Sequence, residues 1–430
     1  MRRSLITAAL VLGLVAAACS SSSSDAAPPG GTAAAAATTG AGAPDATTAD
    51  TTTTTAAAVT TVPVNDETTA APSTLDPLSV ATKYTGPGSF PVGITKLALP
   101  GGAEVVVYYP AVEGTTGTYT YDARDYTAAS VKALLTADLP ATFTFDATLD
   151  APAAAGFHPV ALYSHGFSGF DLVSSDLMRQ LASWGVIVAA PEHHSRDLDA
   201  ATSFKLGDQA DAVGELLGTI DLLEGENDRA GALLQGHVAS NEIVAIGHSA
   251  GGGTVLRAAA DARIDAYVSL ASGALANRDP VTSTTGAPPP MPAKPSLFVA
   301  GKLDNVVSWE TVTKPAYDQA PSPSELWVID GVGHVGFTDL CAMAGGAGII
   351  GVAEASGLGP FLDANPGFRA LGSDGCHPPA LPVEQTWPII HQVVTAFVLG
   401  QFQTLPISST PELAPGVAAA YDVPVVIEQK

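Results

Sequence analysis

The chain has 430 residues and a formal net charge of −24 at pH 7, because 42 Asp and Glu outnumber 18 Lys and Arg. The acidic residues are spread along the chain and the sequence has no basic stripe, which excludes nucleic acid as an expected partner. The same charge disfavours docking on an anionic bilayer, so membrane contact is expected only through a lipid anchor.

The first 18 residues have the pattern of a signal peptide. Two arginines precede an apolar stretch, which ends in small residues just before Cys19. This stretch is too short to span about 30 Å of hydrocarbon comfortably. Cleavage before Cys19 resembles the processing of bacterial lipoproteins, in which that cysteine becomes lipid-modified. We therefore expect a secreted protein of the bacterial cell envelope that is lipid-anchored at Cys19.

Residues 19–80 are expected to form a tether. They consist mainly of Ala, Thr, Ser, Gly and Pro, with no Lys or Arg between Arg3 and Lys83. Such a composition buries too little apolar surface to fold, so we predict a disordered segment. A catalytic domain at 81–402 and a C-terminal extension at 403–430 are expected to follow it.

Short apolar runs after residue 85 predict an α/β fold. Two strands at 93–100 and 104–110 are expected to form a hairpin. Later runs lack polar alternation, which is typical of strands buried on both faces of a parallel sheet. These runs are 159–164, 186–190, 242–247, 266–270, 296–300 and 325–329. Helical patterns occur at 177–184, 213–223, 250–262 and 387–399. We predict a mostly parallel central sheet with helices on both faces.

A serine lies between two glycines just after the run 242–247. Residues 243–253 read Ile-Val-Ala-Ile-Gly-His-Ser-Ala-Gly-Gly-Gly, which is the form of a nucleophile elbow. Ser249 would then occupy a strained strand-to-helix turn, where side chains larger than those of Gly247 and Gly251 would collide. The turn is expected to expose the Ser249 hydroxyl as a nucleophile.

Two further polar side chains lie at the same predicted edge of the sheet. Asp304 and His334 each follow one of the last two predicted strands. A serine hydroxyl needs a base to remove its proton, and the base needs an acid to fix its tautomer. We therefore expect Ser249, Asp304 and His334 to form a catalytic triad. Asp330, which follows the last strand directly, is the alternative acid.

Acyl transfer also requires hydrogen-bond donors for the developing oxyanion. The loop after the strand 159–164 reads His-Gly-Phe-Ser-Gly, and a helix begins after Ser249. The backbone amides of Phe167 and Ala250 are the expected oxyanion hole. The side chains of Phe167, Trp309 and Phe337 either line an apolar acyl pocket, as substrate-binding residues, or pack in the core.

The chain contains 3 cysteines. If Cys19 carries the lipid, Cys341 and Cys376 remain as a pair in a disulfide-permissive chain, and a disulfide between them is expected. No Cys-x-x-Cys motif and no His-rich cluster offers a metal site. We therefore expect neither a metal nor another cofactor.

From about residue 86 to residue 400 the chain resembles an α/β-hydrolase. It is most similar to the platelet-activating factor acetylhydrolase and chlorophyllase-like esterases, and four segments carry the resemblance. They read Ser-His-Gly-Phe-Ser-Gly at 164–169, Ala-Pro-Glu-His-His-Ser-Arg-Asp at 190–197, Gly-His-Ser-Ala-Gly-Gly at 247–252 and Gly-His-Val-Gly-Phe-Thr-Asp at 333–339. The resemblance implies that Ser249 is the nucleophile, Asp304 the orienting acid and His334 the base. It also implies that the amides of Phe167 and Ala250 form the oxyanion hole.

These expectations describe a serine hydrolase that cleaves short-chain or lipid-like carboxylic esters through an acyl-enzyme. The expected partner is a small-molecule or lipid ester. One alternative is a polyester or cutinase-like hydrolase, which shares the elbow but often lacks the His165-Gly166 pair. The alternative from another class is a catalytically idle α/β-hydrolase fold that serves as an envelope binding protein. The intact Ser, Asp and His argue against that alternative.

Overall fold

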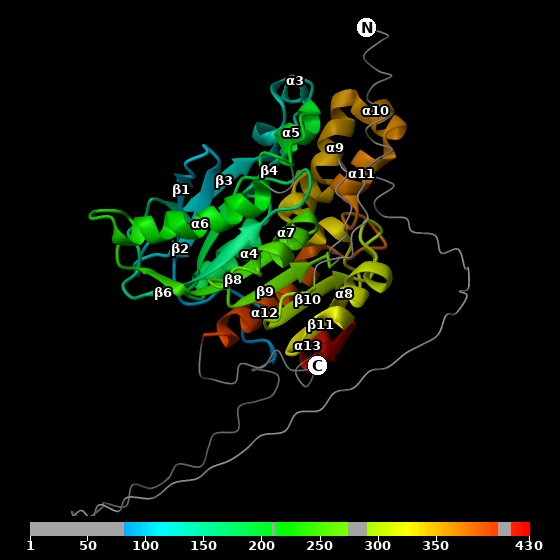
Figure 1. The fold of residues 1–430 in the computed structure, drawn as a ribbon. Helices are drawn as coiled ribbons and strands as arrows, with labels where there is room; N and C mark the ends of the chain where they lie inside the picture. The colour runs from blue at the N-terminus through cyan, green and yellow to red at the C-terminus, as the bar shows by residue number, and fades with distance from the viewer. Residues whose placement is uncertain (1–80, 209–210, 274–289, 403–413) are drawn as a thin grey trace, which may run out of the picture. The chain divides into compact units, whose positions relative to one another are not determined.

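The computed structural model of the chain describes residues 81–208, 211–273, 290–402 and 414–430. The predicted signal peptide, the lipid site at Cys19 and the tether lie outside these residues. Ten strands form one sheet in the order β12-β11-β10-β9-β8-β6-β7-β2-β1-β5 (Figure 1). The strands are β1 (Val92–Ala98), β2 (Glu104–Pro110), β5 (Thr148–Leu149), β6 (His158–Ser164), β7 (Ile187–Pro191), β8 (Val238–His248), β9 (Ala266–Leu270), β10 (Ser296–Gly301), β11 (Ser324–Ile329) and β12 (Val425–Gln429).

The centre of the sheet is parallel. Strands β7, β6, β8, β9, β10 and β11 pair with one another in parallel, whereas β2 is antiparallel to both β1 and β7. The opening hairpin of β1 and β2 and the six later strands all occur at the predicted positions, within a few residues at each end. The predicted α/β fold with a mostly parallel sheet is therefore confirmed.

Strand β8 illustrates why these strands lack polar alternation. Val244 and Ile246 are buried in one core cluster, and Ile243 and Ala245 are buried in the other. Successive side chains of a strand point to opposite faces of the sheet. A strand that is covered on both faces must therefore be apolar at successive positions.

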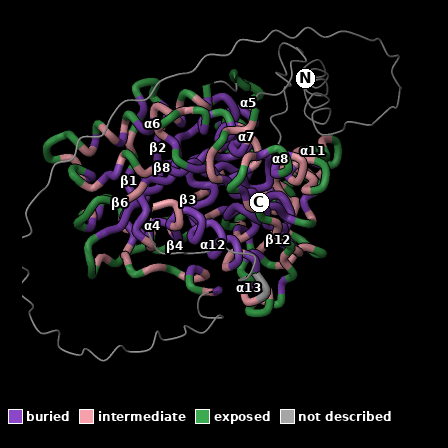
Figure 2. Tube along the Cα trace, turned by 60° about the horizontal axis from the view of Figure 1, so that its bottom comes forward, coloured by how far each residue is buried: buried purple, intermediate pink, exposed green. Residues whose placement is uncertain are grey.

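Helices cover both faces of the sheet. One core cluster contains side chains from α4, α12 and α13, and the other contains side chains from α6, α7 and α8. Figure 2 shows strands as buried segments, with exposed residues concentrated on outer helices and turns. Among the described residues, no helix is both long and apolar enough to cross a membrane. The covering helices are α4 (Ser175–Ser183), α6 (Asp211–Asp228), α7 (Ala250–Ala258), α8 (Lys314–Gln319), α12 (Val383–Gly400) and α13 (Ala414–Tyr421).

Short helices connect these elements. The Gly- and Ala-rich stretch after β11 forms several of them, and α9, α10 and α11 lie beside one another (Figure 1). The short helices are η1 (Ala123–Tyr126), α3 (Ala129–Lys132), α5 (Leu198–Ser203), η2 (Trp309–Thr313), η3 (His334–Phe337), η4 (Asp339–Ala342), η5 (Ala344–Gly346), α9 (Gly348–Ala353), η6 (Glu354–Leu358), α10 (Gly359–Ala364) and α11 (Pro366–Ser373).

Two of the parts of the fold that were not predicted concern the sheets. Strands β3 (Thr118–Asp122) and β4 (Thr142–Asp146) form a separate two-stranded antiparallel sheet. Both alternate threonine with aromatic residues, which is the pattern of a half-buried strand rather than of the fully buried runs on which the prediction relied. At the other end of the chain, β12 adds to the edge of the main sheet, antiparallel to β11. Part of the segment 403–430, which we set apart as an extension, thus belongs to the sheet.

Candidate active site

Ser249 occupies the turn between β8 and α7. Its backbone has φ 55° and ψ −121°, a left-handed conformation that non-glycine residues adopt rarely and at an energetic cost. The residue is only partly buried, whereas the strand residues before it are buried. The turn therefore presents the hydroxyl at the carboxyl edge of the parallel strands, where α/β folds bind their ligands.

The two flanking glycines permit this turn by allowing close backbone contacts. A Cβ atom at Gly247 would lie 2.2 Å from the carbonyl oxygen of Gly251. A Cβ atom at Gly251 would lie 1.9 Å from the carbonyl oxygen of Ser164 at the end of β6. Both positions exclude any side chain, because real Cβ contacts are never so short. The strand, the turn and the helix can therefore pack together only with glycine at both places.

His334 joins Ser249 to Asp304. The Nε2 atom of His334 lies 2.9 Å from the Ser249 Oγ atom, and its Nδ1 atom lies 2.8 Å from Asp304 Oδ2. An Nδ1–H that donates to the carboxylate leaves Nε2 free to accept the serine proton. This is the hydrogen-bond order that a Ser-His-Asp relay requires.

Asp304 is held by its own loop after β10. Its Oδ1 atom accepts hydrogen bonds from the backbone amides of Val306 at 2.9 Å and Val307 at 2.6 Å. Its Oδ2 atom remains for His334. The Asp304 side chain is 1% exposed, so the loop fixes both its position and its orientation.

The alternative acid, Asp330, has other partners. Its Oδ2 atom lies 2.8 Å from Lys302 Nζ, and its Oδ1 atom accepts the amide hydrogen of Gly331 at 2.8 Å. It makes no hydrogen bond to the imidazole of His334, which is bonded to Asp304 instead. The geometry thus favours Asp304 as the partner of the histidine.

The two amides expected for an oxyanion hole have no internal acceptor. Within the described ranges, neither the Phe167 amide nor the Ala250 amide donates a hydrogen bond. The Ala250 amide is the first of α7, and the loop that carries Phe167 passes close to Ser249. A Cβ atom at Gly166 would lie 3.1 Å from the Ser249 Cβ atom. Both donors are therefore available beside the serine for a ligand oxygen.

Two histidines beside the site are buried and serve as braces. Burial lowers the pKa of His165 to about 3, and a nearby Arg196 guanidinium acts in the same direction. Burial also lowers the pKa of His248 to about 3, with a further contribution from His334. His165 bonds to the Gly166 carbonyl oxygen at 2.8 Å, which shapes the loop. Both imidazoles contact backbone carbonyl oxygens, that of Gly166 for His165 and that of His334 for His248.

The three predicted substrate-binding residues lie in different surroundings. Phe167 is partly buried on the loop beside Ser249. Phe337 is buried in the core, with its ring 6.0 Å from that of His248. Trp309 is partly buried at the start of η2 and packs against the other core cluster. The structure thus places Phe167 on the loop beside Ser249 and shows core packing as the role of Phe337.

The predicted disulfide between Cys341 and Cys376 is present, with a sequence separation of 35. Its second cysteine, Cys376, lies two residues after Asp374. The sequence analysis did not identify Asp374 as a site residue. The Asp374 carbonyl oxygen accepts the Val335 amide at 2.9 Å, and its Oδ2 atom accepts the Asn305 amide at 2.8 Å. Asp374 therefore contacts the residue after each of the two triad partners of Ser249.

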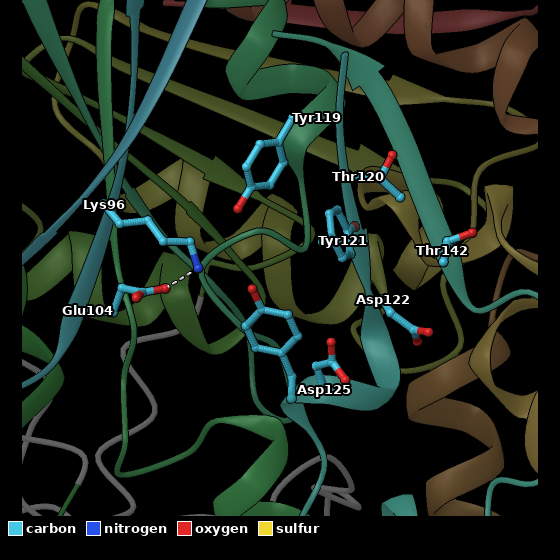
Figure 3. A pocket seen from close by; sticks show the side chains of 9 residues that line it. Lys96, Glu104, Tyr119, Thr120, Tyr121, Asp122, Asp125 and Thr142 are labelled. Carbon is cyan, nitrogen blue, oxygen red and sulfur yellow. Dashed lines mark hydrogen bonds and ion pairs between the residues drawn. The ribbon is translucent and has the colours of Figure 1, made fainter. Parts of the chain in front are cut away.

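A cavity of about 450 Å³ lies apart from these residues (Figure 3). In Figure 3 the Lys96 side chain reaches Glu104, and the two groups lie 2.5 Å apart. None of the predicted site residues lines this cavity. Its lining residues are Lys96, Glu104, Tyr119, Thr120, Tyr121, Asp122, Asp125, Tyr126 and Thr142.

No group of three or more His, Cys, Asp or Glu side chains in the described segments could hold a metal ion. The site contains the partly exposed hydroxyl of Ser249 and the hydrogen-bonded pair of the His334 imidazole and the Asp304 carboxylate. It also contains two backbone amides that donate no hydrogen bond within the described residues. This set can activate an oxygen nucleophile and stabilise a negatively charged oxygen.

Part of the chain is similar to a known protein family. The family model of platelet-activating factor acetylhydrolase, isoform II, matches residues 86–233. The matched segment runs from before β1 into the residues after α6, so it includes the Phe167 loop and ends before Ser249. A search of curated proteins finds no match to the chain. The fold is that of an α/β-hydrolase, and the match over residues 86–233 supports a hydrolase similar to the platelet-activating factor acetylhydrolase, isoform II, family.

Proposed function

We propose that the chain is a serine hydrolase that cleaves short-chain or lipid-like carboxylic esters through an acyl-enzyme. The observation that carries this proposal is the continuous hydrogen-bond chain from Ser249 through His334 to Asp304. In the proposed first step, the Ser249 Oγ atom attacks the ester carbonyl carbon while His334 Nε2 takes its proton. The amides of Phe167 and Ala250 donate to the resulting oxyanion.

Collapse of this tetrahedral intermediate expels the alcohol, which receives its proton from His334. The acyl group then remains on Ser249. A water molecule, deprotonated by the same imidazole, attacks the acyl carbon. The bond from this carbon to Ser249 Oγ then breaks, Oγ takes the proton back from His334, and the carboxylic acid is released. Asp304 keeps the imidazole in the required tautomer and stabilises the imidazolium in both halves of the cycle.

Two assays test this proposal. A fluorophosphonate probe reacts only with an activated serine, so the chain should be labelled and Ser249→Ala should not. p-Nitrophenyl esters of increasing acyl length, a phospholipid and a polyester film then define the substrate class. Hydrolysis of the film in preference to soluble esters would favour a cutinase-like enzyme. A chain that is neither labelled nor active would be an idle fold that serves as a binding protein.

We also propose that Cys19 carries a lipid anchor that holds the protein at a bacterial cell envelope. This proposal rests on the signal-peptide pattern before Cys19. Metabolic labelling with an alkyne fatty acid in a bacterial host tests it. The full chain should be labelled and recovered with membranes, and Cys19→Ser should be recovered unlabelled and soluble.

A further inference from the structure

Arg196 is a buried cation beneath the site, with 1% of its surface exposed. Its Nη1 atom donates to Thr254 Oγ1 at 2.7 Å, and its Nη2 atom donates to Ser164 Oγ and to the His165 carbonyl oxygen, both at 2.8 Å. Its own carbonyl oxygen accepts the Ser168 amide at 2.8 Å. One residue thus contacts the end of β6, the loop that follows it and helix α7.

These contacts lie around the backbone amides of Phe167 and Ala250. The Phe167 amide lies between His165 and Ser168, so Arg196 holds the loop on both sides of it, once by its side chain and once by its backbone. The Ala250 amide begins α7, and Nη1 holds that helix one turn further on. The separation of the two amides therefore depends on one rigid guanidinium.

Arg196 has no direct carboxylate partner within the described part of the chain. Ser164 Oγ lies 2.8 Å from His193 Nε2, and His193 Nδ1 lies 2.7 Å from Glu215 Oε2. The Nε–H of Arg196 is buried without a hydrogen-bond partner among the described residues. Burial lowers the pKa of Arg196 to about 9. A buried charge without a carboxylate partner contributes little to the stability of a fold. The placement of Arg196 therefore points to a role in the active site.

We propose that Arg196 is a positioning residue that sets the distance between the Phe167 and Ala250 amides and so shapes the oxyanion hole. This inference rests on the proposed function, because an oxyanion forms only if Ser249 attacks an ester. Arginine suits the task because its planar fork donates several hydrogen bonds in a fixed geometry, which lysine cannot reproduce.

A positioning role in the oxyanion hole has a specific kinetic signature. The hole binds the charged oxygen of the tetrahedral intermediate and not the neutral ester, so its distortion lowers kcat and leaves KM nearly unchanged. The affinity for an alkyl trifluoromethyl ketone, which forms a charged tetrahedral adduct with the serine, should fall by the same factor as kcat. A general loss of packing would not couple these two quantities.

The test compares Arg196→Met with the wild-type chain on p-nitrophenyl butyrate. We expect kcat to fall about 10²-fold, as for an ångström-scale misplacement of a catalytic group. KM should stay within about threefold, and ketone affinity should fall with kcat. Arg257→Met is the matched control, because Arg257 lies exposed on the same helix α7. Its kcat should equal that of the wild type.

A second variant covers the case in which Arg196→Met does not fold. Thr254→Val keeps the shape of the side chain and removes the Nη1 acceptor on α7, together with the hydrogen bond that the threonine hydroxyl donates to the Ala250 carbonyl oxygen at 3.3 Å. We expect its kcat to fall roughly three- to tenfold with KM unchanged. Thr219→Val is its control, since Thr219 is also a buried helical threonine that bonds to the carbonyl four residues back.

The outcomes separate this inference from the proposed function. A wild-type chain that the fluorophosphonate probe does not label overturns the proposed function and this inference with it. A labelled wild type with near-normal kcat in folded Arg196→Met, or in Thr254→Val where the first variant does not fold, overturns only the inference. So does a fall in kcat without a matching fall in ketone affinity.

Discussion

The Nε2–H of His248 donates to the backbone carbonyl oxygen of His334 at 2.9 Å, and the two rings lie 4.9 Å apart. The residue before Ser249 therefore holds the backbone of the residue whose imidazole contacts Ser249. Because burial lowers the pKa of His248 to about 3, this imidazole stays neutral at every pH at which an esterase is assayed. The brace does not change when the neighbouring histidine gains or loses its proton.

This arrangement predicts a simple pH profile. Between pH 5 and 9, kcat/KM for p-nitrophenyl butyrate should rise with pH as one ionisation, because only neutral His334 can accept the proton of Ser249. His165 and His248 do not contribute, since both have a pKa near 3. Initial rates corrected for spontaneous hydrolysis give the profile. A steeper, two-proton rise would show that a second group besides His334 controls activity in this range.

Ser249→Ala should lower kcat by several orders of magnitude, because the triad members act as a unit and the variant has no nucleophile. The fold should persist, since alanine fits the turn as well as serine does. Circular dichroism and thermal denaturation check the fold. Ser203→Ala, whose hydroxyl bonds within its own helix, should keep full activity. Near-normal turnover by Ser249→Ala would remove the proposed mechanism.

Asp304→Asn should lower kcat roughly 10⁴-fold, because an amide in place of the carboxylate favours the wrong tautomer of His334. Asp330→Asn is the matched control. It loses only a partly exposed ion pair with Lys302, which contributes about 1 kcal/mol or less to stability. We expect its kcat to equal that of the wild type. The reverse order of the two effects would mean that Asp330 is the acid.

The strands and the triad positions follow from patterns that are local in sequence. Buried strands of a parallel sheet read as short apolar runs, and their carboxyl ends meet at one edge. Ser249, Asp304 and His334 each follow such a run, so the sheet alone places them at the same edge. The choice between Asp304 and Asp330 needed the structure, because both residues lie close to strand ends and only loop geometry separates them.

Arg196 and Asp374 could not be identified as site residues from the sequence. The side-chain hydrogen bonds of Arg196 reach residues 31 to 58 positions away along the chain. Those of Asp374 reach Asn305, 69 positions away. No spacing rule connects such residues, because their proximity is set by the tertiary packing of loops. In the sequence, the family resemblance is what points to the run 190–197.

A buried carboxyl group gives a prediction about stability. Asp171 is 1% exposed, and its pKa is raised to about 8 by burial and by the nearby Glu104. Because the folded pKa lies above the unfolded value of about 4, the folded chain binds the extra proton between pH 4 and 8. Each pH unit in this window should lower the folding equilibrium constant about tenfold through this group.

Asp171→Asn should remove this dependence. The free energy of unfolding of the variant minus that of the wild type should increase steadily from pH 4 to pH 8. Above pH 8 this difference should stay constant. Urea denaturation at several pH values measures the difference. Asp176→Asn is an informative comparison, since the pKa of Asp176 is lowered to about 2, with His391 and Arg179 outweighing its burial. A constant difference between Asp171→Asn and the wild type at all pH values would contradict the prediction.

The disulfide should support activity as well as stability. Cys376 lies two residues after Asp374, which contacts the neighbours of both His334 and Asp304. Freed from Cys341, this segment should hold the two triad loops less firmly. The bridge closes a loop of about 35 residues, which in the chain-entropy model corresponds to about 4 kcal/mol of stability.

Replacing Cys341 and Cys376 together by serine should therefore lower kcat under conditions in which the variant is still folded. The unfolding midpoint in urea should fall as well. Because the expected effect is a less firm placement of the two triad loops, KM should change less than kcat. Ser249 should still react with a fluorophosphonate, but more slowly. Reduction of the wild-type chain should reproduce both effects, and reoxidation should reverse them. Full activity in the folded double variant would show that the disulfide stabilises the chain without positioning His334 or Asp304.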